Sequence, residues 1–211
     1  DLKLINEKRP HILDANTEKL LTEAQDALST PSNVYGMFSN ADLEFEDAID
    51  KDGQAYPLTQ GTFIKYLESD DRELRASAFR NVYKAYGAHN NTLGATLAGE
   101  VKKNVFNART HHYRSARERA LSNNHIPEAV YDNLIKTVHK YLPLLHRYTK
   151  LRQELLGLDD LKMYDLYTPL VKDVKFEMPY EEAKSWMLKA LEPMGEEYLN
   201  VVKEGLDNRW V

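Results

Sequence analysis

The sequence contains no cysteine among its 211 residues, which excludes disulfide bonds, thiolate metal sites and a cysteine nucleophile. It has no run that approaches the roughly 18 consecutive apolar residues of a membrane span, and its first residues, Asp1 to Leu4, lack the apolar segment of a signal peptide. Acidic residues (33) outnumber basic ones (28), so the net charge of −5 provides no basic field for nucleic acid. We therefore expect a cytoplasmic protein with neither nucleic-acid nor membrane partners.

What is present is typical of a soluble globular chain. Apolar residues make up 42% of the sequence and charged residues 29%, and the length allows one large or two small domains with an apolar core. Apolar residues recur mostly at steps of three and four, the period of an amphipathic helix. The fold class that we expect is mainly α, a multi-helix array with long kinked helices and one small β-hairpin.

Capping residues, glycines and prolines set the expected helix boundaries. The expected helices run from Asp14 to Leu28, from Pro31 to about Phe38, after Thr59, from Asp70-Asp71 to near Tyr113, from Pro127 to about Leu156, after Pro179, and from Glu196 to about Leu206. The longest pattern contains Gly87 and Gly94, which favour a bend. Pro143 is expected to kink the helix from Pro127 to about Leu156, because proline removes a hydrogen bond and clashes with the preceding turn.

One segment changes to the two-residue period of a strand. Apolar and acidic residues alternate from Leu43 to Ile49, Asp52-Gly53 is a strong turn signal, and Gln54 to Leu58 provides a return strand. Pro57 cannot donate to a strand ladder, so the return strand is expected to be short or at an edge. The sequence therefore predicts a β-hairpin at about residues 43–58.

Seven histidines without cysteine raise the question of a metal site. A helical His-Glu-x-x-His would place two ligands and a general base on one face, and no histidine here stands in that pattern. His139 and His146 share a helix face but are about 10 Å apart at 1.5 Å per residue, too far for one zinc ion. The adjacent His111 and His112 point to different faces. None of these is predicted to bind metal, and the same holds for His11, His89 and His125.

Basic residues gather between Lys102 and Arg119, where Glu118 is the one acid. The basic strip consists of Lys102, Lys103, Arg109, His111, His112, Arg114, Arg117 and Arg119. A functional interpretation is a binding surface for phosphate or for an acidic peptide. A solvated helix end, where cations complement the helix dipole, explains the strip more simply.

Four of the thirteen tyrosines, Tyr83, Tyr86, Tyr164 and Tyr167, are candidates to line a peptide groove, because each ring offers apolar contact and its hydroxyl a hydrogen bond. For Tyr83 and Tyr86 the helical spacing is explained more simply by core packing. Carboxylate pairs are plentiful but have no apolar setting that would shift a pKa. No phosphate-binding loop, serine-hydrolase motif or calcium loop is present. The residues alone therefore predict no catalytic, cofactor-binding or metal-binding residue.

Several stretches, taken together in their order and spacing, resemble oligoendopeptidase F, a member of the thimet-oligopeptidase-like zinc peptidases. They are Phe45–Gly53 with Pro57–Thr59, Tyr66–Arg75 followed by Phe79–Tyr83, Ala108-Arg109 with Tyr113–Leu121 and Ile126-Pro127, Leu155–Leu158, Met163–Tyr167, and Asn208–Val211. The likeness covers essentially the whole chain. It implies a helical peptidase with a deep channel, which cleaves short unstructured peptides in the cytoplasm.

In the family that the chain resembles, zinc is bound by a His-Glu-x-x-His motif and a later Glu, downstream of the Asn-Arg-Trp segment, and the Glu of the motif activates the water. The resemblance implies that this chain is part of a zinc-dependent endopeptidase. Residues 1–69 would be an N-terminal module and residues 70–211 the first, helical part of the catalytic domain. This part is expected to form channel wall and scaffold against the remainder of the catalytic domain, to bind no zinc and to be inactive alone.

Two other functions stay open at this point. One is a stand-alone helical peptide-binding or scaffold protein without catalysis. The other is a nucleic-acid binder that uses the basic strip, which the acidic balance disfavours. The start at Asp1 and the apolar end at Trp210-Val211 indicate a piece of a longer chain. We then expect helices that expose apolar surface where further chain would pack, and self-association of the isolated chain.

Overall fold

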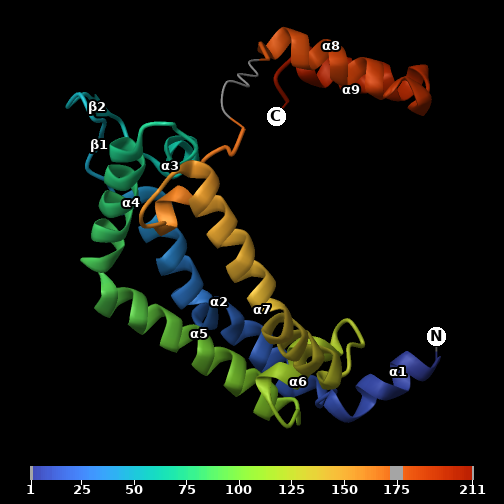
Figure 1. Ribbon diagram of the computed structural model, residues 1–211. Coiled ribbons are helices and arrows are strands. Elements are labelled where there is room, and N and C mark those ends of the chain that lie inside the picture. The colour runs from blue at the N-terminus through green and yellow to red at the C-terminus, as the bar shows by residue number, and fades with distance from the viewer. Residues whose placement is uncertain (1, 172–177, 211) are drawn as a thin grey trace. The chain divides into compact units, whose positions relative to one another are not determined.

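The computed structural model describes residues 2–171 and 178–210, and it divides into two units after Leu170. The first unit carries the helices α1 to α7 and a small β-sheet, and the second carries α8 and α9 (Figure 1). The predicted mainly α fold with one hairpin is confirmed.

The elements of the first unit follow one another with short connections. They are α1 (Leu2–Lys8), the 3-10 turn η1 (Arg9–His11), α2 (Ala15–Met37), the π turn η2 (Phe38–Asp42), β1 (Ala48–Ile49), β2 (Ala55–Tyr56), α3 (Gln60–Leu67), α4 (Arg72–Gly87), α5 (Asn90–Thr110), α6 (Ala116–Ser122), α7 (Glu128–Leu156) and the 3-10 turn η3 (Met163–Asp165). The second unit contains α8 (Tyr180–Ala190), the 3-10 turn η4 (Glu192–Met194) and α9 (Glu196–Asp207).

α2 is one helix of 23 residues that runs through Pro31, so the prediction of two helices that meet before this proline is wrong. Asp14 caps its N-terminus, as expected, and accepts hydrogen bonds from backbone N–H groups of the first turn. The helix continues because proline removes only one backbone bond and because the Pro31 ring packs on α5. A Cβ added to Gly99 of α5 would lie 2.7 Å from Pro31 Cγ. α2 and α5 accordingly lie side by side (Figure 1).

α4 and α5 replace the single long helix that the sequence pattern predicted. The chain leaves helical geometry between Gly87 and Asn90 and turns sharply there (Figure 1). The bend therefore lies at Gly87, and Gly94 sits within α5 without a break. Thr110 ends α5, and the short α6 then begins after Ser115, whose side chain accepts a hydrogen bond from the backbone N–H of Glu118. The sequence patterns did not indicate α6.

The β-hairpin is confirmed but is shorter than the segment 43–58. β1 and β2 pair antiparallel, with Ala48 opposite Tyr56 and Ile49 opposite Ala55. Its turn depends on Gly53, whose φ of +82° favours glycine. The hairpin is fixed to α4 because the backbone N–H of Ile49 donates to the Ser77 hydroxyl at 2.7 Å.

The apolar core of the first unit lies where the hairpin, α3 and α4 meet. Its buried members are Ala48, Leu58, Leu74, Ala78 and Val82, with Phe45, Tyr56, Phe63, Tyr66 and Tyr86 packed around them. Tyr86 thus packs in the core as predicted. Tyr83, three residues earlier, is 57% exposed, so the prediction of core packing is wrong for this residue.

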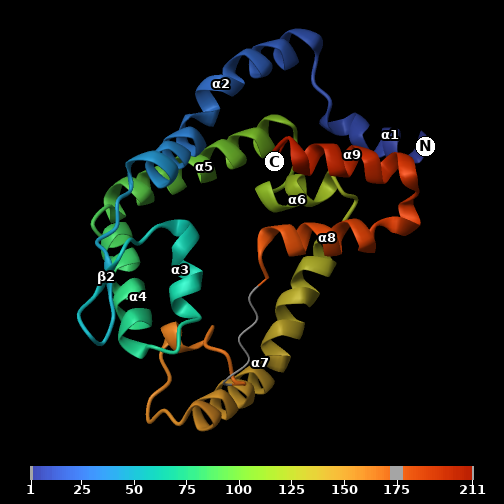
Figure 2. The same ribbon diagram turned by 90° about the horizontal axis from the view of Figure 1, so that it is seen from above.

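α7 begins after Pro127 and ends at Gly157, which adopts a left-handed conformation with φ of 65°. Both boundaries match the sequence prediction. Its axis bends along its length, and Pro143 stands inside it (Figure 2). Large apolar side chains are exposed along nearly the whole helix, for example Leu134, Leu144 and Leu155. The expectation of helices with exposed apolar surface is confirmed here.

The second unit is a helical hairpin. α8 and α9 are joined through η4, and the predicted break at Pro193 to Gly195 is confirmed. Lys184 of α8 forms an ion pair with Asp207 of α9. No helix of the described residues is long and apolar enough to cross a membrane.

Candidate functional site

The histidine side chains do not converge on a metal centre. His139 and His146, which the sequence placed on one helix face, are both exposed on α7. Over residues 2–171 and 178–210, no three His, Cys, Asp or Glu side chains are grouped so that they could hold a metal ion. Since a catalytic zinc ion takes about three protein ligands, the donors of this part of the chain do not fit one.

Two of the histidines tie the start of the chain to the end of α5. His11 stacks on Tyr113 with ring centroids 3.6 Å apart, and its Nδ1 donates to the carbonyl of His111 at 2.8 Å. His111 in turn donates from Nδ1 to the carbonyl of Asn107 at 2.8 Å, and its Nε2 lies 3.7 Å from a carboxylate oxygen of Glu18 in α2. These contacts explain both histidines as structural groups.

The centre of the basic strip is neutralised by acids of α6 and α7. Arg114 donates from Nε to Glu118 at 2.9 Å, and Arg117 donates to Glu128 at 2.7 Å and to Asp132 at 2.9 Å. The hydrogen bond from the Arg114 side chain holds the pKa of Glu118 below its ordinary value. These ion pairs connect α6 to α7, while the side chains of Arg114 and Arg117 stay 78% and 43% exposed. The interpretation of the strip as a solvated surface therefore remains the simpler one.

Among the described residues, the buried charged side chains Arg75, Arg152 and Asp165 lie together, and the partly exposed Arg72 joins them. We call Arg72, Arg75, Arg152 and Asp165 the Asp165 cluster. The Asp165 side chain is fully buried, and its Oδ1 accepts hydrogen bonds from Arg75 Nη2 at 2.8 Å and from Arg72 Nε at 3.2 Å. Its Oδ2 accepts one from Arg72 Nη2 at 3.0 Å. Three elements thus meet at Asp165 of η3: Arg72 and Arg75 of α4 bind its carboxylate, and Arg152 of α7 binds its backbone carbonyl.

The cluster also holds the loop that follows α7. Arg152 Nη2 donates to the backbone carbonyl of Asp165 at 3.2 Å and to that of Thr168 at 2.6 Å. Arg72 Nη2 donates to the carbonyl of Asp160 at 2.6 Å, and the backbone N–H of Lys162 donates to Asp165 Oδ2 at 2.9 Å. Since both the side chain and the backbone of the loop are bonded, its conformation is fixed against α4 and α7.

The charge of Asp165 is retained despite its burial. Burial raises the pKa of this carboxyl, but the hydrogen bonds from Arg72, Arg75 and the backbone N–H of Lys162, together with the charge of Arg72, outweigh it, and the pKa lies below its ordinary value of 3.8. Asp165 is therefore ionised at neutral pH. An ionised carboxylate without these partners would be costly in this position.

A continuous row of side chains runs from the Asp165 cluster along the outer side of α4. We call Arg72, Tyr164, Phe79 and Tyr83 the Arg72 row. The Arg72 guanidinium lies 5.6 Å from the ring centroid of Tyr164, which lies 5.9 Å from that of Phe79 in an edge-to-face contact. The ring centroids of Phe79 and Tyr83 lie 4.4 Å apart. Tyr164 thus contacts Arg72 and Phe79, and its role in a peptide groove stays a prediction. Tyr167 is 53% exposed and Tyr86 packs in the core, and neither contributes a ring contact to this row.

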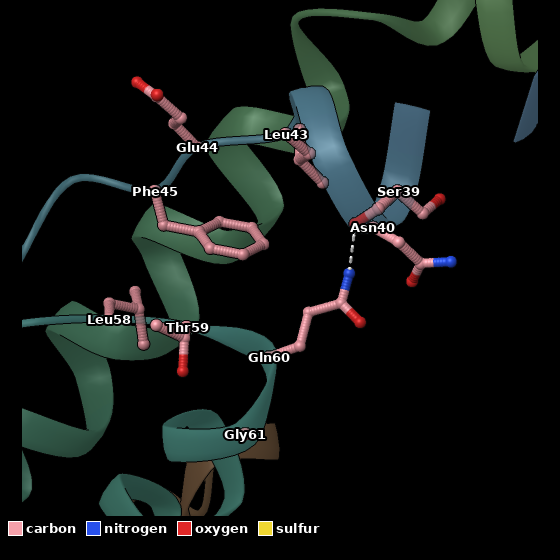
Figure 3. A pocket seen from close by; sticks show the side chains of 9 residues that line it. All are labelled: Ser39, Asn40, Leu43, Glu44, Phe45, Leu58, Thr59, Gln60 and Gly61. Atoms are coloured by element: carbon pink, nitrogen blue, oxygen red, sulfur yellow. Dashed lines mark hydrogen bonds between the residues drawn. The ribbon is translucent and has the colours of Figure 1, made fainter. Parts of the chain in front are cut away.

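A cavity of about 510 Å³ lies between η2, the segment after it and the start of α3. Figure 3 shows Phe45 and Leu58 on one side of it and the Gln60 amide reaching toward Ser39, whose carbonyl accepts its hydrogen bond at 2.6 Å. Glu44 is the one titratable side chain in its lining. The cavity therefore offers polar contacts but no acid–base pair.

A second, more apolar cavity of about 470 Å³ lies between α2 and α5. Its lining includes the exposed Tyr35 and Leu97, the Pro31 ring and the carboxylate of Glu100. Glu100 is engaged by Lys103, which lies 2.6 Å away. Neither cavity combines the groups that peptide-bond hydrolysis requires.

Two family descriptions match this chain. One, described as "Peptidase family M3", matches residues 65–208, and the other, described as "Oligopeptidase F", matches residues 1–45. "Oligopeptidase PepF" of Bacillus subtilis is 55% identical over 207 residues, which are 98% of this chain and 31% of that protein. "Group B oligopeptidase PepB" of Streptococcus agalactiae is 44% identical over 203 residues, 96% of this chain and 34% of that protein.

The fold matches a solved structure as well. The crystal structure of oligoendopeptidase-F from Enterococcus faecium superposes with a TM-score of 0.78 at 42% identity, over 97% of this chain and 38% of that one. The chain thus spans about a third of the length of the relatives it matches.

Proposed function

Since this chain belongs to peptidase family M3, we propose that it is part of a zinc-dependent oligoendopeptidase that hydrolyses peptide bonds in short oligopeptides in the cytoplasm. The observation that carries the proposal is the 55% identity to an oligopeptidase over 98% of the chain. At that identity over nearly every residue, the same fold and the same structural role are the simplest expectation. The whole activity is a proposal, because the chain spans about a third of that protein.

Within such an enzyme, this chain serves as channel wall and scaffold. Residues 1–69 would be the N-terminal module and residues 70–211 the first, helical part of the catalytic domain. The exposed apolar side chains of α7 support this assignment, because large exposed apolar patches mark contact surfaces. The partner that covers them would be the remainder of the catalytic domain.

We assign no catalytic, cofactor-binding or metal-binding residue to this chain. Zinc in the whole enzyme would polarise the peptide carbonyl and activate a water molecule, with ligands from outside this chain. This chain supplies long helices, α4, α5 and α7, and the Asp165 cluster fixes the loop directly after α7 against α4 and α7.

A segment exchange tests the proposal. The 207-residue matching segment of the Bacillus subtilis relative would be replaced by this chain, and hydrolysis of an internally quenched oligopeptide would be followed by fluorescence. We expect turnover within about tenfold of the parent's, abolished by a zinc chelator and restored by added zinc. The isolated 211-residue chain is the matched control, and it should bind no stoichiometric zinc and cleave nothing.

Three results would contradict the proposal. A folded, zinc-loaded exchange protein without turnover would show that this chain cannot serve as the scaffold of such an enzyme. Turnover by the isolated chain would show that it contains an active site of its own. Tight peptide binding by the isolated chain, together with failure of the exchange, would favour the stand-alone binding protein instead.

A further inference from the structure

The Asp165 cluster carries more positive charge than its carboxylate neutralises. Three guanidinium groups contact one residue, Asp165, whereas the neighbouring carboxylate of Asp160 is paired with Lys162 at 2.5 Å. Arg75 and Arg152 are buried. Uncompensated charge in a region of low dielectric creates a potential that extends to the nearest exposed group.

Arg72 is where this potential reaches the solvent. Its side chain is 39% exposed, against 4% for Arg75. Its Nε and Nη2 are fixed by Asp165 and Asp160, while Nη1 donates no hydrogen bond to any of the described residues. The free edge of the guanidinium is therefore held in one orientation, and little rotamer entropy remains to be lost when an anion binds there.

The aromatic part of the Arg72 row begins beside the guanidinium group itself, since Arg72 Cζ lies 5.6 Å from the ring centroid of Tyr164. Tyr164 follows Arg72, then Phe79, then the exposed Tyr83. The two centroid separations, 5.9 and 4.4 Å, correspond to at most about three residues of an extended chain at about 3.3 Å each. A fixed cation next to a short aromatic row matches a ligand with a carboxylate at one end and apolar side chains beside it.

We propose that the Arg72 row binds the C-terminal end of a short peptide, with the terminal carboxylate on Arg72 and the last side chains on Tyr164, Phe79 and Tyr83. This ligand follows from charge complementarity, since the surplus of the cluster is positive and a free peptide C-terminus is an anion. An inorganic anion would leave the rings unused. The inference rests on the proposed function only for the choice of a peptide as ligand.

The test is direct binding to the isolated chain. An N-terminally dansylated Gly-Gly-Ala-Ala-Phe peptide with a free carboxylate would be compared with its C-terminal amide by fluorescence titration. We expect the free acid to bind about three- to tenfold more tightly, as a charge-assisted hydrogen bond at a half-exposed site allows. The difference should shrink at about 1 M salt, where the Debye length falls to about 3 Å.

Substitutions on α4 separate charge from ring contact. Arg72→Gln should abolish the preference for the free acid, whereas Arg80→Gln, which removes the same charge from an exposed position on the same helix, should keep it. Tyr83→Ala should weaken the binding of both peptides, the free acid and the amide, by a similar factor of about three to ten. Arg72→Gln also removes a hydrogen-bond partner of Asp165, so this variant can lose stability. The comparison of the free acid with the amide in the unaltered chain tests the inference without any variant.

Equal binding of acid and amide, no binding of either, or an equal loss of preference in Arg80→Gln would each overturn the inference. These outcomes are separable from failure of the proposed function. A segment-exchange enzyme that cleaves peptides, combined with an isolated chain that ignores the carboxylate, refutes the Arg72 site alone. Selective carboxylate binding without turnover in the exchange leaves the site standing and refutes the enzyme.

Discussion

The contact between Gly99 of α5 and Pro31 of α2 allows a prediction with an internal reference. α2 and α5 lie side by side in the first unit (Figure 1), and at Gly99 there is no room for a side chain on α5. A Cβ at Gly99 would lie 2.7 Å from Pro31 Cγ and 3.1 Å from Pro31 Cβ. Carbon atoms attract each other best at about 3.5–4.0 Å. A methyl group at Gly99 must therefore push the two helices apart or strain a rigid ring.

The magnitude follows from a comparison with Gly94 of the same helix, where an added Cβ meets nothing within 4 Å. Both substitutions by alanine gain about 1 kcal/mol of helix propensity. At Gly99 this gain is opposed by overpacking, which typically costs about 1–3 kcal/mol. The two variants should therefore differ by about 1–3 kcal/mol in the free energy of unfolding, with Gly94→Ala the more stable.

Urea denaturation of Gly99→Ala and Gly94→Ala, followed by circular dichroism, measures this difference. Because both variants exchange glycine for alanine within α5, the propensity term cancels. Pro31→Ala removes the shorter of the two contacts, so Gly99→Ala should cost less in a Pro31→Ala background than in the parent, a comparison in which the helix-propensity gain at position 31 cancels. Equal stability of the two glycine variants would refute the packing argument, since it would mean that the helices adjust at no cost.

Three further substitutions and conditions test other contacts. Asp165→Asn should lower the free energy of unfolding by about 3–5 kcal/mol, because it leaves buried guanidinium groups without their carboxylate; chemical denaturation measures this. The pKa of Asp165 is depressed in the folded chain, so its ionisation stabilises the fold above the unfolded pKa, and this stability is lost as the pH falls through the folded pKa. Between about pH 5 and about pH 3 the parent should lose more stability than Asp165→Asn, and a parallel loss in both would contradict the assignment. Thr59→Ala should cost about 1 kcal/mol in thermal or urea unfolding, because Thr59 and Thr62 form a capping box at α3, whereas Thr22→Ala on exposed α2 should change little.

Elements whose cause is local could be predicted from the sequence. Asp14, Thr59, Pro127 and Gly157 act through their own backbone or the next turn, and each stands at a boundary where the pattern placed it. The hairpin was recognisable for the same reason, since Gly53 satisfies a positive φ that its turn requires.

The wrong predictions concern positions whose structure depends on a contact with a residue far away in the sequence. The sequence pattern at Pro31 predicts the start of a helix. In the structure the Pro31 ring packs against Gly99, 68 residues further along the chain, and α2 continues through the proline. Tyr83 shares the helical spacing of the core residues, but the hairpin and α3 cover the opposite side of α4, so Tyr83 stays exposed. The periodicity of a sequence shows that one face of a helix is apolar, but it does not show which neighbouring element covers that face.

The Asp165 cluster escaped sequence reasoning entirely. Asp165 stands in a loop between Tyr164 and Leu166, where a carboxylate normally faces water. Its partners Arg72 and Arg75 lie 93 and 90 residues earlier, and no local pattern connects them. The one available signal was the pair of arginines on the first turns of α4, a position where the helix dipole disfavours cations. Two arginines at this position are consistent with a buried anion beside the helix start.

The separation between these arginines and their carboxylate also orders the assembly of the chain in time. At about 5–20 residues per second, a ribosome needs roughly 5–20 seconds to extend the chain from Arg75 to Asp165. The hairpin, α3 and α4 have all their mutual contacts between residues 45 and 86, so they can pack early in that interval. Leu74 at the start of α4 belongs to this core, but the neighbouring Arg72 and Arg75 have no Asp165 carboxylate to bind until the loop after α7 is made. The completed cluster therefore marks the moment at which α4 and α7, far apart in the sequence, become one structural body.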